Sequence, residues 1–210
     1  MPPQSLEAYR RAIDLGAEGV EADLWLTSDD RPVVLHPRIP LPGSVARRSR
    51  SALASSVPDL EDVYRVIGSQ TELALDAPDP RAAPFAVDLA RAHGAAAHLW
   101  LTYWRIPVLA DWRRRWPDIR LVFPTLLLPW RRPGALLDRL SDAGVDALNI
   151  HMRRVSPALV GACHDRGLLL FVWGGDGSAA ERALAAGADG VFADDVPALV
   201  AAVQRRRGTR

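Results

Sequence analysis

Three acidic residues in the first 76 positions have the types and spacing to bind a divalent cation. Glu21 and Asp23 are two residues apart in the alternating segment 20–26 (VEADLWL), and a period of two places both carboxylates on one face of a strand. Asp76 ends a later apolar run, LALD. Mg²⁺ and Ca²⁺ prefer such oxygen ligands, and like charges on a buried face are costly without a cation. Spacing alone leaves one alternative open, in which each carboxylate pairs with an arginine.

One histidine could move a proton beside these carboxylates. His36 follows the apolar run VVL at 33–35, so we expect it near the end of a strand. A neutral imidazole can take or give a proton near pH 7, which makes His36 the candidate catalytic residue; a purely structural histidine is the alternative. His151 ends a later apolar run, ALNIH, and is the one candidate stand-in for proton transfer.

Apolar runs of strand length alternate with segments of helical period along the whole chain. The pattern predicts strands at 20–26, 33–36, 73–76, 97–102, 120–125, 147–150, 168–173 and 190–193. It predicts helices at 5–15, 59–67, 83–93, 108–116, 134–143, 157–166, 179–186 and 197–206. Gly144, Gly167 and Gly187 each follow a helical segment, and we expect them to cap it in the left-handed conformation.

Repeated strand–helix units of this kind predict a parallel sheet. We favour a (β/α)8 TIM-type barrel over a doubly wound sheet, because the sequence shows no glycine-rich dinucleotide loop. The chain opens directly in a helix, so we expect the barrel to lack its first strand. Functional groups of such barrels lie at the carboxyl ends of the strands, where the three carboxylates and both histidines are expected.

The composition is that of a globular protein and excludes several classes of function. Of 210 residues, 49% are hydrophobic and 24% charged, which predicts one barrel domain over 1–203 and a basic tail over 204–210. A formal net charge of +1 gives no field that would attract nucleic acid or an anionic membrane. No apolar run is long enough to span a membrane and no signal-peptide pattern opens the chain, so we expect a cytoplasmic protein. All 26 basic residues are arginine, so no lysine is available to clamp a phosphate.

A tryptophan-rich stretch raises the question of self-association. Five tryptophans lie between positions 100 and 130: Trp100, Trp104, Trp112, Trp116 and Trp130. Packing in the core or between helices is the simpler interpretation. The alternative is that some of them cover an exposed barrel edge in a homodimer.

Several motifs together resemble those of the glycerophosphodiester phosphodiesterases. The opening segment PPQSLEAYRRAIDLGAEGVEADLWLTSDDRPVVLHP is similar to the family pattern P-E-N-T-x-x-A-F, followed by G-A-D-x-(I/V)-E-x-D and V-x-H-D. VPDLEDVY at 57–64 is similar to I-P-T-L-E-E-(V/A)-L. The carboxyl-terminal segment is similar to W-T-V-N and G-(V/A)-D-G-(I/V)-x-T-D-x-P. The resemblance covers residues 3–36, 57–78 and 144–200.

The resemblance implies a (β/α)8 barrel that hydrolyses glycerophosphodiesters, which are small-molecule substrates, to glycerol 3-phosphate and an alcohol. Glu21 and Asp23 match metal ligands of the family, and Asp76 takes the place of its third ligand, a glutamate. His36 matches the second of two catalytic histidines, and Trp173 matches the tryptophan of W-T-V-N and is assigned to substrate binding. The cofactor implied is a divalent cation, Mg²⁺ or Ca²⁺.

The chain departs from the family pattern at catalytic positions. The family's H-R-G motif, with its first histidine, has no counterpart here, while Pro37 and Pro78 replace an aspartate and a lysine. Either the true start lies upstream or the chain is a degenerate relative, and the internal prolines favour degeneration. We therefore expect an enzyme of impaired activity. The alternative is a non-catalytic barrel that binds phosphorylated ligands or a protein partner, so the resemblance leaves open whether the chain is an enzyme.

Overall fold

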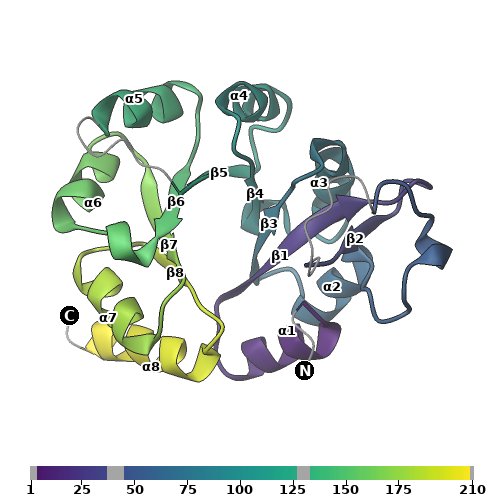
Figure 1. Ribbon diagram of the computed structural model, residues 1–210, viewed down its shortest axis with the longest axis horizontal. Helices are drawn as coiled ribbons and strands as arrows, with labels where there is room; N and C mark the ends of the chain where they lie inside the picture. Colours follow the sequence, from purple (N-terminus) through teal and green to yellow (C-terminus); the bar gives the residue numbers. More distant parts are fainter. Residues whose placement is uncertain (1–3, 37–44, 127–132, 209–210) are drawn as a thin grey trace. The chain divides into compact units, whose positions relative to one another are not determined.

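The computed structural model describes residues 4–36, 45–126 and 133–208 (Figure 1). The chain divides into two compact units. The first consists of Met1–Thr102 with Asp118–Arg120, and the second consists of Tyr103–Pro117 with Leu121–Arg210. Strands and helices alternate in both units, as the sequence predicts.

The first unit is built on a four-stranded sheet in the order β2-β1-β3-β4. β1 is parallel to β3 and β3 is parallel to β4, while β2 returns antiparallel along β1. The bounds of its elements are α1 (Leu6–Asp14), β1 (Gly19–Leu26), β2 (Pro32–Val34), α2 (Leu60–Ile67), β3 (Glu72–Asp76), α3 (Ala83–Ala92) and β4 (Leu99–Thr102). Short 3-10 turns lie at Arg50–Ala52, Pro80–Ala82 and Ala96–His98.

Local sequence signals account for the elements that carry the acidic residues. The hydroxyl of Ser5 accepts a hydrogen bond from the backbone N–H of Ala8 at 3.2 Å and so caps the first turn of α1. In β1, Ala22 and Leu24 are fully buried and alternate with Glu21 and Asp23. The period of two therefore turns the acidic residues to the face opposite these two core residues.

The second unit repeats the same plan with four parallel strands in the order β5-β6-β7-β8. Gly144, Gly167 and Gly187 end its helices at φ of 70°, 69° and 101°, which confirms the expected left-handed caps. The bounds are α4 (Ile106–Arg115), β5 (Arg120–Thr125, whose first residue belongs to the first unit), α5 (Gly134–Asp142), β6 (Ala147–His151), a 3-10 turn (Met152–Arg154), α6 (Pro157–His164), β7 (Leu169–Trp173), α7 (Gly177–Ala185), β8 (Gly190–Phe192) and α8 (Val196–Gly208).

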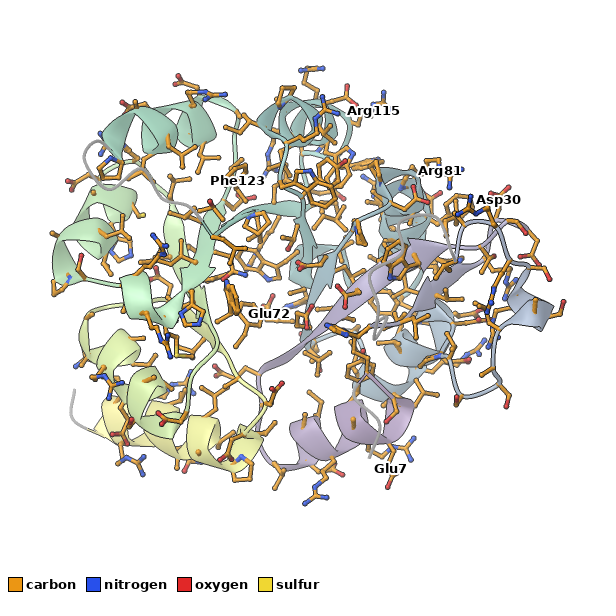
Figure 2. All side chains as sticks on the ribbon, viewed as in Figure 1. Glu7, Asp30, Glu72, Arg81, Arg115 and Phe123 are labelled. Carbon is orange, nitrogen blue, oxygen red and sulfur yellow. The ribbon has the colours of Figure 1, made fainter. Side chains whose placement is uncertain are left out.

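Carboxylates tie strands together at their amino ends. Glu72, labelled in Figure 2, begins β3; its carboxylate accepts a hydrogen bond from Trp100 Nε1 at 2.6 Å and lies 2.9 Å from His98 Nδ1. In the second unit, Asp146 accepts the backbone N–H of Leu121 at 2.6 Å. Such bonds satisfy strand groups that would otherwise be buried without a partner.

Some predicted boundaries are corrected by the structure. The strand expected at 97–102 begins only at Leu99, because Ala96–His98 forms a 3-10 turn. β2 ends at Val34, so His36 lies beyond the strand. α8 runs from Val196 to Gly208 and so extends beyond the helix predicted at 197–206. Within the described residues, α1 is the first element and no helix is long and apolar enough to cross a membrane.

The tryptophans divide between buried and exposed positions. Trp100 and Trp112 are about 95% buried, which confirms core packing for these two. Trp104 is 52% exposed. Trp130 lies outside the described residues.

Candidate metal centre

The three acidic residues singled out by spacing come together at the carboxyl ends of β1 and β3. In the parallel register of β1 and β3, Asp23 lies opposite Asp76. Glu21 lies opposite Ala74, two residues before Asp23 and on the same face of β1. One carboxylate oxygen from each of Glu21, Asp23 and Asp76 lies within 4.8 Å of the other two. The structure thus brings the three together, while their role as ligands remains a prediction.

Asp23 is held by a side chain from the segment that precedes α1. Gln4 Nε2 donates a hydrogen bond to Asp23 Oδ2 at 3.0 Å, and the backbone N–H of Asp23 donates to Gln4 Oε1 at 3.3 Å. His36 Nε2 lies 4.0 Å from the same Oδ2. Burial raises the pKa of Asp23, while the hydrogen bond from Gln4 and the neighbouring His36 act in the opposite direction.

Asp76 is the most strongly perturbed carboxyl group of the cluster. Burial, reinforced by the charge of Asp23, raises the pKa of Asp76 to about 6, and a hydrogen bond with the side chain of Thr102 opposes this shift. Tyr9 of α1 is 4% exposed, and its hydroxyl is buried without a hydrogen-bond partner. Burial and then the charges of Glu21 and Asp23 raise the pKa of this phenol. Negative charge is therefore concentrated at the carboxyl ends of β1 and β3.

The donor set suits one divalent cation. All three residues offer carboxylate oxygens, the ligands that hard cations take. Ca²⁺–oxygen distances of about 2.3–2.6 Å allow two ligands of one ion to lie about 5 Å apart, and Mg²⁺ needs a slightly tighter set. A cation would also offset the repulsion that raises the pKa of Asp76. Glu21, Asp23 and Asp76 therefore fit Mg²⁺ or Ca²⁺.

The β1–β2 hairpin brings His36 to this cluster. The backbone N–H of Leu35 donates to the Asp23 carbonyl at 3.0 Å, and Trp25 Nε1 donates to the Leu35 carbonyl at 2.9 Å. These two bonds fix the chain just before His36, whose side chain is 64% exposed. The imidazole can therefore exchange protons with water while it stands near Asp23.

The second unit places two aromatic rings at the carboxyl ends of its strands. His151 of β6 and Trp173 of β7 are register partners, and their rings meet edge to face with centroids 4.7 Å apart. His151 Nδ1 accepts the backbone N–H of Arg153 at 3.1 Å, so the proton of the neutral ring is on Nε2. A Cβ added at Gly174 would lie 2.9 Å from that Nε2. Trp173 and His151 thus form one aromatic pair.

Sequence reasoning found the carboxylates but missed Gln4. The bond from Gln4 to Asp23 spans 19 residues, and no local pattern reports such a partner. Tyr9, whose phenol lies near Glu21 and Asp23, was missed too. Gln4 and Tyr9 both lie in the opening segment that resembles the family pattern, and this resemblance was the available signal.

Comparison with known proteins identifies relatives of this fold. Residues 1–47 match the family model described as the glycerophosphoryl diester phosphodiesterase family. No curated protein sequence matches the chain significantly.

Solved structures resemble the chain over nearly its whole length. A phosphodiesterase from Oleispira antarctica, in complex with the product sn-glycerol-3-phosphate, has a TM-score of 0.82 at 20% identity, covering 97% of this chain and 92% of its own. A glycerophosphodiester phosphodiesterase from Parabacteroides distasonis has a TM-score of 0.79 at 18% identity, with coverages of 98% and 90%. A glycerophosphodiester phosphodiesterase from Thermotoga maritima has a TM-score of 0.78 at 19% identity, covering 94% of this chain and 90% of its own. The chain therefore has the TIM-type fold of these proteins.

Proposed function

We propose that this chain, whose residues 1–47 match the model of the glycerophosphoryl diester phosphodiesterase family, hydrolyses glycerophosphodiesters to glycerol 3-phosphate and an alcohol. The observation that carries the proposal is the convergence of Glu21, Asp23 and Asp76 with His36 beside them. The product bound to the Oleispira antarctica relative supports the same substrate class. The substrate is then a small molecule with a negatively charged phosphodiester.

In the proposed reaction, water is added across one P–O ester bond. The water oxygen bonds to phosphorus, the bond to the alcohol oxygen breaks, and that oxygen takes up a proton. Glu21, Asp23 and Asp76 would hold the divalent cation, Mg²⁺ or Ca²⁺. When bound, the cation neutralises phosphate charge and polarises phosphorus. His36 moves the proton, since its imidazole is solvent-accessible and stands beside the cluster.

We propose that turnover is slow. The chain contains no lysine that could contact the phosphate, and Pro78 occupies the family's lysine position. A lysine that faced the phosphate would stabilise charge in the transition state, and without it the reaction is slower. The same absences favour the second candidate function, a barrel that binds phosphorylated ligands or a protein partner without turning a substrate over.

Trp173 is proposed as a substrate-binding residue, because a tryptophan at a strand's carboxyl end offers an apolar face to the alcohol or glycerol group. The half-exposed Trp104 is compatible with a homodimer. Dimerisation and a cytoplasmic location remain predictions from the sequence.

Turnover of glycerophosphocholine with millimolar Mg²⁺ or Ca²⁺ tests the proposal. We expect activity well below an ordinary kcat of about 10 per second, and complete loss of it in His36→Ala. His93→Ala is the matched control, since His93 stacks on Tyr64 within the same unit and should retain activity.

Three outcomes separate the candidate functions. Full activity in His36→Ala would reject His36 as the proton carrier. Turnover near 10 per second in the unaltered protein would reject the proposed impairment. No turnover, together with a rise in melting temperature on adding glycerol 3-phosphate, would favour the non-catalytic barrel.

A further inference from the structure

Gln4 has an unusual backbone conformation directly before the first helix. Its φ is 54°, a region that few residues other than glycine adopt. Ser5, the next residue, caps α1, so the helix start is fixed immediately after this turn. A strained conformation persists only where surrounding interactions hold it, and at Gln4 these interactions include its two hydrogen bonds to Asp23.

The side-chain amide of Gln4 matches Asp23 at two points. Its oxygen accepts the backbone N–H of Asp23, and its nitrogen donates to Oδ2 of the carboxylate. One planar amide therefore fixes the carboxylate relative to its own backbone and opposes rotation about the side-chain bonds. A glutamate at position 4 would offer no donor and would add a like charge, and an asparagine would be one methylene shorter.

We propose that Gln4 is a positioning residue of the metal centre, which holds the Asp23 carboxylate in the orientation that binds a divalent cation together with Glu21 and Asp76. The inference rests on the proposed function, since it concerns the cation assigned to that site. Groups that orient ligands by hydrogen bonding typically contribute 10–100-fold to metal affinity. The oxygen that Gln4 holds, Oδ2, also lies 4.0 Å from His36 Nε2.

Calorimetric titration with CaCl₂ or MgCl₂ measures this role without relying on turnover. We expect Gln4→Ala to raise the dissociation constant of the cation about 10–100-fold. The dissociation constant of Gln4→Asn should fall between those of Gln4→Ala and the unaltered protein. Ser5→Ala is the matched control: it disturbs the start of α1 at the neighbouring residue but does not contact Asp23. It should lower the melting temperature and leave the dissociation constant unchanged.

Activity against cation concentration gives a second measurement. Gln4→Ala should regain its maximal rate at higher cation concentration, whereas Asp23→Ala should not regain it at any concentration. Equal affinity in Gln4→Ala and the unaltered protein would overturn the inference and leave the proposed function standing. Equal losses of affinity in Gln4→Ala and Ser5→Ala would also overturn it, because the effect would then come from the helix start. No cation binding by the unaltered protein would overturn both proposals.

Discussion

The strands carry carboxylates at both ends, and the partners of these carboxylates differ between the ends. At the amino ends, three carboxylates are each paired with a basic side chain: Glu72 with His98, Asp146 with Arg113, and Asp189 with His164. Asp146 and Asp189 also accept a backbone N–H from a neighbouring strand, that of Leu121 and Leu170 respectively. These carboxylates already have hydrogen-bonding partners and act as structural clamps.

At the carboxyl ends of β1 and β3, Asp23 and Asp76 are hydrogen-bonded to neutral side chains, and the basic His36 lies 4.0 Å from Asp23 Oδ2, beyond hydrogen-bonding distance. Gln4 donates to Asp23, and Thr102 is bonded to Asp76. A neutral donor orients a carboxylate without cancelling its charge. Burial raises the pKa of both carboxyl groups, and the charge of Asp23 raises that of Asp76 further. The comparison teaches that the partner, more than burial, separates a structural carboxylate from one available to a cation.

The largest expected effect concerns the pH dependence of stability in the metal-free protein. Asp76 has a pKa of about 6 in the folded state, against an ordinary value of 3.8, so the folded state binds more protons between these values. Stability contributed by this group is therefore present below about pH 4 and lost as the pH rises to about 6, by roughly 3 kcal/mol at 1.36 kcal/mol per pH unit. Asp76→Asn should remove this loss.

Urea unfolding in EDTA from pH 4 to 7 measures the difference between the two proteins. Because other groups titrate equally in both, the stability gained by Asp76→Asn should grow with pH up to about 6 and then stay constant. Parallel curves at all pH values would show that Asp76 is compensated in the same way as the amino-end carboxylates.

The next effect is thermal stabilisation by the cation. At a concentration 100 times its dissociation constant, Mg²⁺ or Ca²⁺ should stabilise the unaltered protein by about 2.7 kcal/mol, which corresponds to roughly 5–10 °C in melting temperature. Asp23→Ala should lose this shift. Asp146→Asn should melt at a lower temperature and keep the shift, since Asp146 belongs to an amino-end clamp. A shift lost in both variants would remove the distinction between the two ends.

The fold could be predicted from the sequence in more detail than the geometry of the acidic cluster. The alternation in 20–26 placed Glu21 and Asp23 on one face, and the glycines after the helices marked three caps, because these are local regularities. The distance between Asp23 and Asp76 depends on the register of β1 against β3, which no local pattern encodes. The contact of Gln4 with Asp23 could not be predicted for the same reason, since the two residues lie 19 positions apart and Gln4 has a φ of 54°.

A smaller effect is expected when an amino-end clamp is removed. In Asp189→Ala the backbone N–H of Leu170, a fully buried residue, loses its acceptor, and His164 loses its partner. A buried unsatisfied donor costs about 1–3 kcal/mol, so we expect a loss of that size in the free energy of unfolding by urea. Cation affinity should not change. A weakened cation affinity would mean that the clamp supports the metal centre as well as the fold.

The smallest effect compares two glycines with nearly the same φ but different surroundings. Gly68 and Gly174 have φ of 76° and 78°, so alanine at either position is strained by about 1–3 kcal/mol. A Cβ at Gly68 meets nothing within 4 Å, whereas at Gly174 it would lie 2.9 Å from His151 Nε2. His151 is packed edge to face on Trp173, so the ring cannot yield without disturbing that pair.

We therefore expect Gly174→Ala to cost about 1 kcal/mol more than Gly68→Ala in urea unfolding, the lower limit for overpacking. A double-mutant cycle isolates the cause: in a His151→Ala background the excess should disappear, because the added methyl group then meets no ring. Equal costs for the two glycines in the unaltered background would show that the His151 ring moves freely. The carboxyl end of β6 would then hold a mobile imidazole, in contrast to the Asp23 carboxylate that Gln4 fixes at the carboxyl end of β1.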